Sequence, residues 1–223
     1  MKTTSRRPLL LSVISVLALA GAALAPAGSI VTVVHGQNAQ QNAADLERLT
    51  RALDARSGSA IGEIGAGGGE LTFAMSRVVG ASGRVYSNEL NKDSLAAIRK
   101  RATDDHLENV IPVEGKDDVA NLPEGCCDGI FMRNVYHHFG DPPSMNASLL
   151  RALKPGGRLA IIDFTPPPPS ASTENPPGHR GEDNHHGITA ATLEKELKAA
   201  GFEIVSSGDA GRDVFVVARR PSV

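Results

Sequence analysis

The sequence predicts an α/β fold: a doubly wound, mostly parallel sheet of seven strands, with helices on both faces. Three observations carry this prediction. Strand-like apolar segments alternate with helical segments from residue 59 to residue 201. A glycine-rich turn, "IGEIGAGGGELT" (61–72), joins the first strand to the following helix. The segments 202–207 and 213–220 are separated by a short turn, so we expect the final strand to run antiparallel.

The individual elements follow from hydrophobic spacing and from helix-breaking residues. In the first helix, Leu46, Leu49 and Leu53 recur at helical spacing, and Gly58 ends the element. Pro112 has no amide hydrogen to donate, so its strand should lie at an edge of the sheet. We expect helices at 43–58, 69–80, 91–105, 141–157 and 189–201, and strands at 59–64, 83–89, 109–115, 127–134, 157–164, 202–207 and 213–220.

The N-terminal region has a different character from the rest of the chain. Lys2, Arg6 and Arg7 precede an uncharged run, and Ala25-Pro26-Ala27 offers a cleavage site. This is the pattern of a secretory signal, and "TSRRPLLL" also resembles a twin-arginine signal. The uncharged run continues to Val34, so an uncleaved membrane anchor is the alternative. We therefore expect a signal or anchor at 1–27, a flexible lead-in at 28–44 and a globular domain at 45–223.

This pattern predicts an exported protein, periplasmic or tethered to the membrane, with the membrane contacted only through an uncleaved leader. A misassigned start site would make the protein cytoplasmic instead.

The formal net charge of −2 and the lack of a basic stripe argue against nucleic acid as a partner. The two cysteines, Cys126 and Cys127, are adjacent, and neighbouring residues rarely form a comfortable disulfide. We interpret them as small buried hydrophobic residues.

The glycine-rich turn has three possible ligands. A phosphate-binding P-loop needs Lys followed by Ser or Thr after its last glycine, whereas Glu70-Leu71 stands there. A dinucleotide fingerprint needs a third glycine at the position of Glu70, where a carboxylate would repel a pyrophosphate. The spacing acidic-x-Gly-x-Gly-x-Gly, from Glu63 to Gly69, fits a third possibility best: an uncharged nucleoside.

This spacing resembles the nucleoside-binding loop of class I S-adenosylmethionine-dependent methyltransferases. Over about residues 45–219 the order of motifs is similar, including "GRVYSNE" with an acid at the end of the second strand and "LKPGGRLAIIDF" in the fifth. The resemblance implies a Rossmann-like sheet, S-adenosyl-L-methionine as the cofactor, and Glu89 as the acceptor of the ribose hydroxyls. It assigns the cofactor contacts to Glu63, Gly65, Ala66, Gly67, Gly69, Glu89, Leu90, Asp117 or Asp118, Arg133 and Asn134.

The chemistry is expected after the fourth strand, in "FMRNVYHHFGDP" (131–142), because ligands of open α/β sheets bind beyond the carboxyl ends of strands. Relatives of this methyltransferase group often carry a similar "N-x-x-H-H-F" stretch. His137 and His138 are the candidate catalytic residues, since histidine titrates in the range needed to remove a proton from the acceptor. A role in packing and backbone bonding is the alternative. Asp163, at the end of the fifth strand, is expected at the mouth of the pocket.

The segment 165–187 is a long loop rich in proline and histidine, of the kind that often forms a functional lid. It contains His179, His185 and His186, but no spacing of residues fixes a metal geometry, so we expect no metal site. The sequence as a whole predicts a methyltransferase that acts on a small-molecule acceptor by in-line transfer. A non-catalytic, exported nucleoside-binding protein is the alternative. The acceptor and the oligomeric state are not specified by the sequence.

Overall fold

The computed structural model describes residues 28–168, 173–182 and 185–222. Residues 38–223 form one compact unit. The expected signal or anchor at 1–27 lies outside the described residues. Within the described part of the chain, no helix is both long enough and apolar enough to span a bilayer.

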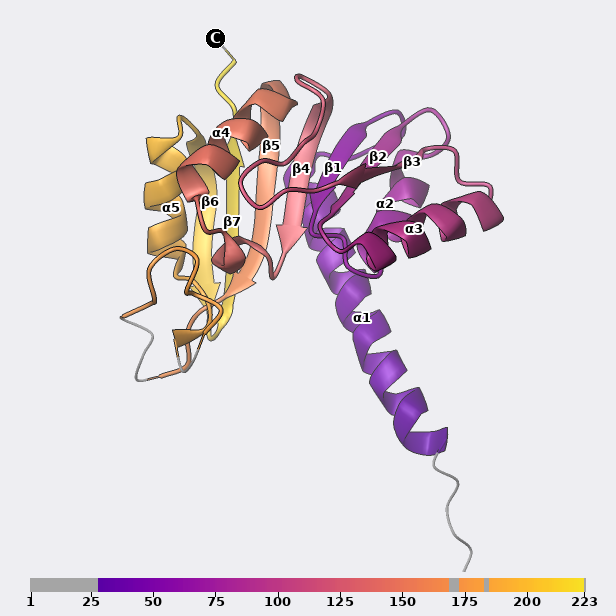
Figure 1. The fold of residues 1–223 in the computed structure, drawn as a ribbon, viewed down its shortest axis with the longest axis horizontal. Coiled ribbons are helices and arrows are strands. Elements are labelled where there is room, and N and C mark those ends of the chain that lie inside the picture. Colours follow the sequence, from indigo (N-terminus) through magenta and orange to yellow (C-terminus); the bar gives the residue numbers. More distant parts are fainter. Residues whose placement is uncertain (1–27, 169–172, 183–184, 223) are drawn as a thin grey trace, which may run out of the picture. The chain divides into compact units, whose positions relative to one another are not determined.

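A seven-stranded sheet is the centre of this unit, and its order β3-β2-β1-β4-β5-β7-β6 can be followed in Figure 1. The strands are β1 (Ala60–Ile64), β2 (Arg84–Glu89), β3 (Val110–Glu114), β4 (Cys127–Arg133), β5 (Leu153–Phe164), β6 (Glu203–Ala210) and β7 (Asp213–Arg219). The strands β1 to β5 run parallel to one another, and β7 pairs antiparallel with both β5 and β6. The prediction of a mostly parallel sheet with an antiparallel last strand is confirmed. Pro112 lies in the edge strand β3, as expected.

The helices cover both faces of the sheet. They are α1 (Gly28–Leu53), α2 (Glu70–Val79), α3 (Lys92–Asp104), α4 (Pro142–Ala152) and α5 (Ala190–Ala199). One core cluster joins α1 and α2 to the sheet, for example through Leu49 and Met75. A second cluster joins α4 and α5 to the other face, for example through Leu149 and Leu197. Each cluster removes apolar area from water, which is the main stabilising contribution to such a layered fold.

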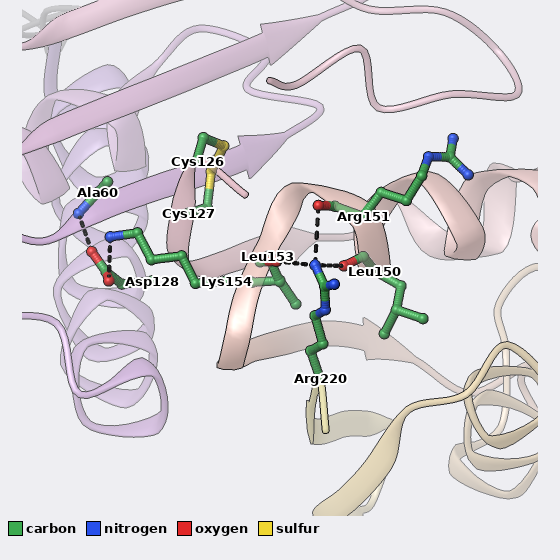
Figure 2. Close-up of a disulfide and its surroundings, with 9 residues drawn as sticks. All are labelled: Ala60, Cys126, Cys127, Asp128, Leu150, Arg151, Leu153, Lys154 and Arg220. Atoms are coloured by element: carbon green, nitrogen blue, oxygen red, sulfur yellow. Dashed lines mark hydrogen bonds and ion pairs between the residues drawn. A yellow bond between two sulfur atoms is a disulfide. The ribbon is translucent and has the colours of Figure 1, made fainter. Parts of the chain in front are cut away.

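Several boundaries differ from the sequence-based expectation, and α1 ends at Leu53 rather than at Gly58. The segment 28–44, expected as a flexible lead-in, belongs to α1. Ala and Gln are abundant there, and both favour helix. The helix expected at 141–157 ends at Ala152, because Leu153 already pairs with Cys127 in the sheet. Arg220 donates from Nη1 to the carbonyl oxygens of Leu150, Arg151 and Leu153, so it satisfies groups that the end of α4 leaves unpaired (Figure 2).

The cysteine pair at the start of β4 is a disulfide, so the expectation of two unbonded cysteines is wrong. Figure 2 shows the bond between Cys126 and Cys127, whose Cα atoms are 3.7 Å apart. Cys127 is nevertheless fully buried in the core, as expected for a small hydrophobic residue. Beside the pair, Asp128 accepts a hydrogen bond from the amide of Ala60 and pairs with Lys154. The disulfide lies at the amino end of β4, away from the strand ends where a ligand is expected.

Candidate active site

The glycine-rich turn leads from β1 into α2, and its glycines adopt conformations that other residues avoid. Gly65 and Gly67 have φ angles of +70° and +54°. A Cβ atom at Gly65 would lie only 2.5 Å from Cγ2 of Val135, whereas a Cβ at Gly67 would meet no atom within 4 Å. Gly65 is therefore needed for close packing against the turn after β4. Gly67 instead borders open space, where the bare backbone leaves room for a ligand.

Glu89, at the end of β2, holds this turn in place. Its Oε2 accepts a hydrogen bond from the amide of Gly67 at 2.7 Å, and its Oε1 accepts one from the amide of Asn91 at 2.8 Å. The amide of Ala66 also donates to the carbonyl of Asn88 at 2.9 Å. A carboxylate offers about four lone-pair sites, so these two bonds leave acceptor capacity on Glu89. Glu89 is 9% exposed, and it could accept hydrogen bonds from a diol while it keeps its hydrogen bonds with the amides of Gly67 and Asn91.

Glu63 lies behind the turn in a buried chain of polar groups. Thr72 of α2 donates a hydrogen bond to the Glu63 carboxyl group, and the hydroxyl oxygens of Thr72 and Ser87 are 2.8 Å apart. Burial raises the pKa of Glu63 to about 8, although the bond from Thr72 and the charge of Arg133 oppose the shift. This series of hydrogen-bonded polar side chains explains why the polar Ser87 occupies a buried position in β2.

The other residues expected near the nucleoside lie beside Glu89 or in the loop after β3. Leu90 is 52% exposed and directly follows Glu89, so its side chain is available to a ligand. Asp117 and Asp118 are both exposed on the loop. The side-chain amide of Asn88 donates to the carbonyl of Ala120 and thereby fixes the end of this loop. The contacts do not favour one aspartate over the other, and both remain predictions.

The end of β4 joins the glycine turn to a pocket. Asn134 adopts a φ of +57°, and its amide donates to the carbonyl of Ile162 at 2.8 Å. Arg133 turns toward α1, where it donates to Asn42 and pairs with the buried Asp45 at 3.1 Å. This part of α1 was not predicted to lie at the site, because no motif in the sequence links it to β4.

His137 occupies a short 3-10 turn, Tyr136–His138, directly after β4. Its Nδ1 lies 2.8 Å from Oδ1 of Asp163 at the end of β5, and the ring is only 1% exposed. The backbone amide of Phe164 also donates to Oδ1 of Asp163. A carboxylate in this position holds the imidazole with Nδ1 protonated and leaves Nε2 as the free acceptor. Asp163 therefore orients His137 toward the ligand side of the sheet.

The long loop adds a third histidine that the sequence did not connect with the other two. His186 Nε2 lies 2.9 Å from Nε2 of His137, and the rings of His137 and His138 are 3.9 Å apart between centroids. Burial lowers the pKa of His138, as do the nearby His137 and His186. Burial also lowers the pKa of His186, with His137 contributing in the same direction. These shifts favour uncharged imidazoles. His179 and His185, the other two histidines of the loop, do not belong to this cluster.

Two contacts hold the loop over the strand ends. Arg180 is 3% exposed and forms an ion pair with Glu196 of α5, with Nη2 2.6 Å from Oε1. The next residue after His186 is Gly187, where a Cβ would lie 2.4 Å from the carbonyl oxygen of Phe164. Only glycine allows such a close approach, so the loop reaches the end of β5 and places His186 against His137.

A cavity of about 530 Å³ opens beside this cluster at the carboxyl ends of β4 and β5. It is lined by Gln41, Asp45, Arg133, Asn134, Ile162, Asp163, Phe164, His186, Arg212 and Asp213. A second cavity, of about 580 Å³, lies at the amino ends of the central strands, around Asp128 and Lys154. We take the first cavity as the candidate site, because ligands of open α/β sheets bind at the carboxyl ends of the strands.

Comparison with known proteins identifies the region that contains the turn, Glu89 and the histidine pair. Residues 62–161 match the methyltransferase domain family. The matched residues run from within β1 to within β5, and they include both the glycine turn and His137.

Curated relatives agree with this match over a similar part of the chain. The ubiquinone/menaquinone biosynthesis C-methyltransferase UbiE of Saccharophagus degradans is 34% identical over 113 residues, which is 50% of this chain and 45% of that protein. The protein of the same name from Vibrio parahaemolyticus is 32% identical over 114 residues, which is 51% of this chain and 44% of that protein. The chain thus matches about half the length of these relatives.

Solved structures share the fold of this chain. A SAM-dependent methyltransferase from Aquifex aeolicus superposes with a TM-score of 0.66 at 22% identity, covering 79% of this chain and 89% of that one. The [4+2]-cyclase SpnF superposes with a TM-score of 0.69 at 15% identity, covering 80% and 81%. The Rossmann-like fold is therefore shown. Because a protein named as a cyclase has the same fold, the fold alone does not fix the reaction.

The predicted site residues thus fall into three groups. Glu89 and the glycines of the turn are joined by hydrogen bonds, and Val135 connects them to the histidine turn. His137 and His138 lie beside the cavity together with Asp163, at the strand ends where they were expected. Glu63 is turned toward Thr72, while Arg133 is turned toward α1. The contacts of each residue with a cofactor remain predictions.

Proposed function

We propose that the protein is an S-adenosyl-L-methionine-dependent methyltransferase that transfers a methyl group to a small-molecule acceptor. The match of residues 62–161 to the methyltransferase domain family supports this activity, and the similar solved structure named as a SAM-dependent methyltransferase supports the cofactor. The observation that carries the proposal is the link between Glu89 and Gly67. It places an acid with spare acceptor capacity next to bare backbone that borders open space.

These residues fit the cofactor chemically. A nucleoside needs an acceptor for its two ribose hydroxyls and close contact with uncharged backbone, and the arrangement of Glu89 and Gly67 provides both. The exposed Leu90 would offer an apolar surface to the base. When bound, the cofactor supplies an electrophilic methyl group to a nucleophilic atom of the acceptor. The protein then has to align the two and exclude water.

The acceptor side of the site would be the cavity beside His137. Asp163 fixes the His137 ring, so that Nε2 faces away from the carboxylate. An oxygen or nitrogen acceptor has to lose a proton during transfer. His137, with His138 next to it, could receive this proton at Nε2 once the contact of that nitrogen with His186 is released. The lining contains both acidic and basic side chains, including Asp213 and Arg212, which suits a small polar molecule.

Calorimetry of the full chain with S-adenosyl-L-methionine tests the cofactor half of the proposal. Glu89→Ala should weaken binding by about 1–3 kcal/mol, which is about 5- to 150-fold, because the hydrogen bonds to the diol are lost. Glu124→Ala removes an exposed acid from the loop before β4 and should leave the affinity unchanged. Wild-type protein that fails to bind at millimolar cofactor, or a Glu89→Ala variant with unchanged affinity, would overturn the assignment.

A turnover experiment separates an enzyme from a nucleoside-binding module. The full chain is incubated with methyl-labelled cofactor and a small-molecule extract, and the label is followed into products by mass spectrometry. The proposal expects a labelled product that disappears in a His137→Gln variant that still binds the cofactor. Cofactor binding without label transfer to any compound of the extract would favour the non-catalytic alternative.

We also propose that the protein is exported. The proposal is supported by the basic N-terminus followed by an uncharged run in the sequence, and by the disulfide, because disulfides persist in oxidising compartments. Mass spectrometry of the N-terminus of protein from fractionated cells tests this. A retained Met1 in a soluble cytoplasmic fraction would contradict it.

A further inference from the structure

The strongest unassigned feature is the cluster formed by His137, His138 and His186. Each ring offers a nitrogen, and the three nitrogens lie within 4.8 Å of one another. His137 and His138 belong to the turn after β4, whereas His186 comes from the loop before α5. Since the loop is held at this place by buried contacts, the convergence is a property of the tertiary fold.

We propose that these three histidines form a binding site for a divalent transition-metal cation. Imidazole nitrogen is a preferred ligand for Zn²⁺ and its neighbours in the first transition row. Three protein ligands with one position left open are typical of zinc sites that act on a substrate. The cavity of about 530 Å³, which His186 lines, would provide access to that open position.

The support of His137 by Asp163 matches what a metal ligand requires. A histidine that binds a metal through one ring nitrogen usually donates the other N–H to a carboxylate, which fixes the tautomer and the direction of the ring. Asp163 occupies this position at 2.8 Å from Nδ1 of His137, and it is almost completely buried. Nε2 of His137, the ring nitrogen that Asp163 does not hold, therefore points toward His186.

The distance between the Nε2 atoms of His137 and His186 is close to the distance between two nitrogen ligands of one metal ion. Nε2 of His137 and Nε2 of His186 are 2.9 Å apart, which is the distance of a hydrogen bond between the two rings, with one proton between the nitrogens. Two imidazole ligands on a tetrahedral zinc ion are about 3.3 Å apart, given zinc–nitrogen bonds of about 2.0–2.1 Å. A cation that replaces the proton thus requires only a small separation of the rings. His138 is exposed, so its ring has room to turn toward the ion.

Metal binding in this form does not depend on the methyltransferase activity, because it uses only the three imidazoles and Asp163. A cation would take the lone pair of His137 Nε2 that direct proton transfer would use. It would then lower the pKa of an acceptor hydroxyl bound at the open position, in place of His137. The ligand class is therefore a borderline transition-metal ion, with an oxygen atom of the acceptor as its further ligand.

Titration of the chelator-treated full chain with Co²⁺ and Zn²⁺ tests the proposal. We expect one ion per chain, with micromolar or tighter affinity, and visible absorption bands of nitrogen-coordinated Co²⁺. Mg²⁺ should not compete, because it prefers oxygen ligands. Each of His138→Ala and His186→Ala should weaken binding by at least about 100-fold. Asp163→Asn, which loses only the support of His137, should weaken it by about 10- to 100-fold.

Two controls keep the test decisive. His179→Ala removes an exposed histidine from the same loop and should leave metal binding unchanged. Thermal unfolding of each variant shows that the fold is retained, and calorimetry with S-adenosyl-L-methionine on the same samples reports the cofactor site separately. Absence of stoichiometric binding to the wild-type chain would overturn the proposal, as would binding that survives both His138→Ala and His186→Ala.

Discussion

Replacement of the buried Glu63 by Gln should make the protein more stable at alkaline pH. Burial raises the pKa of this carboxyl group from 4.5 to about 8 in the folded protein. Because the folded pKa lies above the unfolded one, the stability that Glu63 contributes is complete below about pH 4.5. It is lost as the pH rises to about 8. A shift of 3.5 units (8 − 4.5) corresponds to a loss on the order of 5 kcal/mol, at about 1.4 kcal/mol per unit.

Urea unfolding of wild type and Glu63→Gln between about pH 5 and pH 9 measures this effect. Gln cannot ionise and can still accept the hydrogen bond from Thr72. The free energy of unfolding of the variant minus that of wild type should therefore rise by about 1.4 kcal/mol per pH unit up to about pH 8 and then level off. Glu70→Gln, at an exposed acid on the first turn of α2, should show no such rise. A difference that is flat or falls with pH would mean that Glu63 is ionised in the folded protein, and would refute the reasoning.

Three further perturbations test the packing around the site and at the start of β4. Gly65→Ala should lower the free energy of unfolding by about 1–3 kcal/mol in urea titrations, because its φ is positive and its Cβ would collide with Val135. Gly140→Ala, where a Cβ meets no atom within 4 Å, is the matched control, and an equal loss in both variants would contradict the argument. Arg180→Ala should cost about 3–5 kcal/mol, since it leaves Glu196 without its buried partner, and should speed proteolysis within 165–187. A loss below about 1 kcal/mol with unchanged proteolysis would show that this pair does not hold the loop. Reduction of the disulfide at the start of β4 should change the free energy of unfolding by only on the order of 1 kcal/mol, because bonding adjacent residues closes almost no loop. Intact mass should show two hydrogens fewer in the unreduced chain, and alkylation of the unreduced protein at both cysteines would contradict the bond.

Much of the fold could be predicted from local patterns in the sequence. The alternation of strands and helices, the edge position of Pro112 and the antiparallel end of the sheet all depend on periods and residue types that act over a few residues. The strand that ends at Glu89 and the turn that contains Gly65 were found for the same reason. A parallel sheet brings the carboxyl ends of its strands to one edge, so the sequence order of these motifs already indicated a shared site.

Other features depended on contacts between distant segments, and no local pattern contains them. The disulfide was missed because the general rarity of bonds between neighbouring cysteines outweighed any local signal at Cys126 and Cys127. The buried Ser87 of β2 has its hydrogen-bond partner in Thr72 of α2, and Thr72 in turn donates to Glu63 of β1; no local pattern in the sequence links these three residues. Such contacts are determined by three-dimensional packing, and local propensity and periodicity do not predict them.

The sequence by itself determined the class of fold, the glycine turn and the acid that holds it, since these depend on backbone conformation and on short spacings. Only the tertiary structure decided which histidines meet. His186 is 49 residues from His137 along the chain, and the two are brought together by Arg180 and by the close approach of Gly187 to the end of β5. Side-chain clusters of this kind are set by how a loop is anchored, and that anchoring depends on contacts that form only when the whole domain has folded.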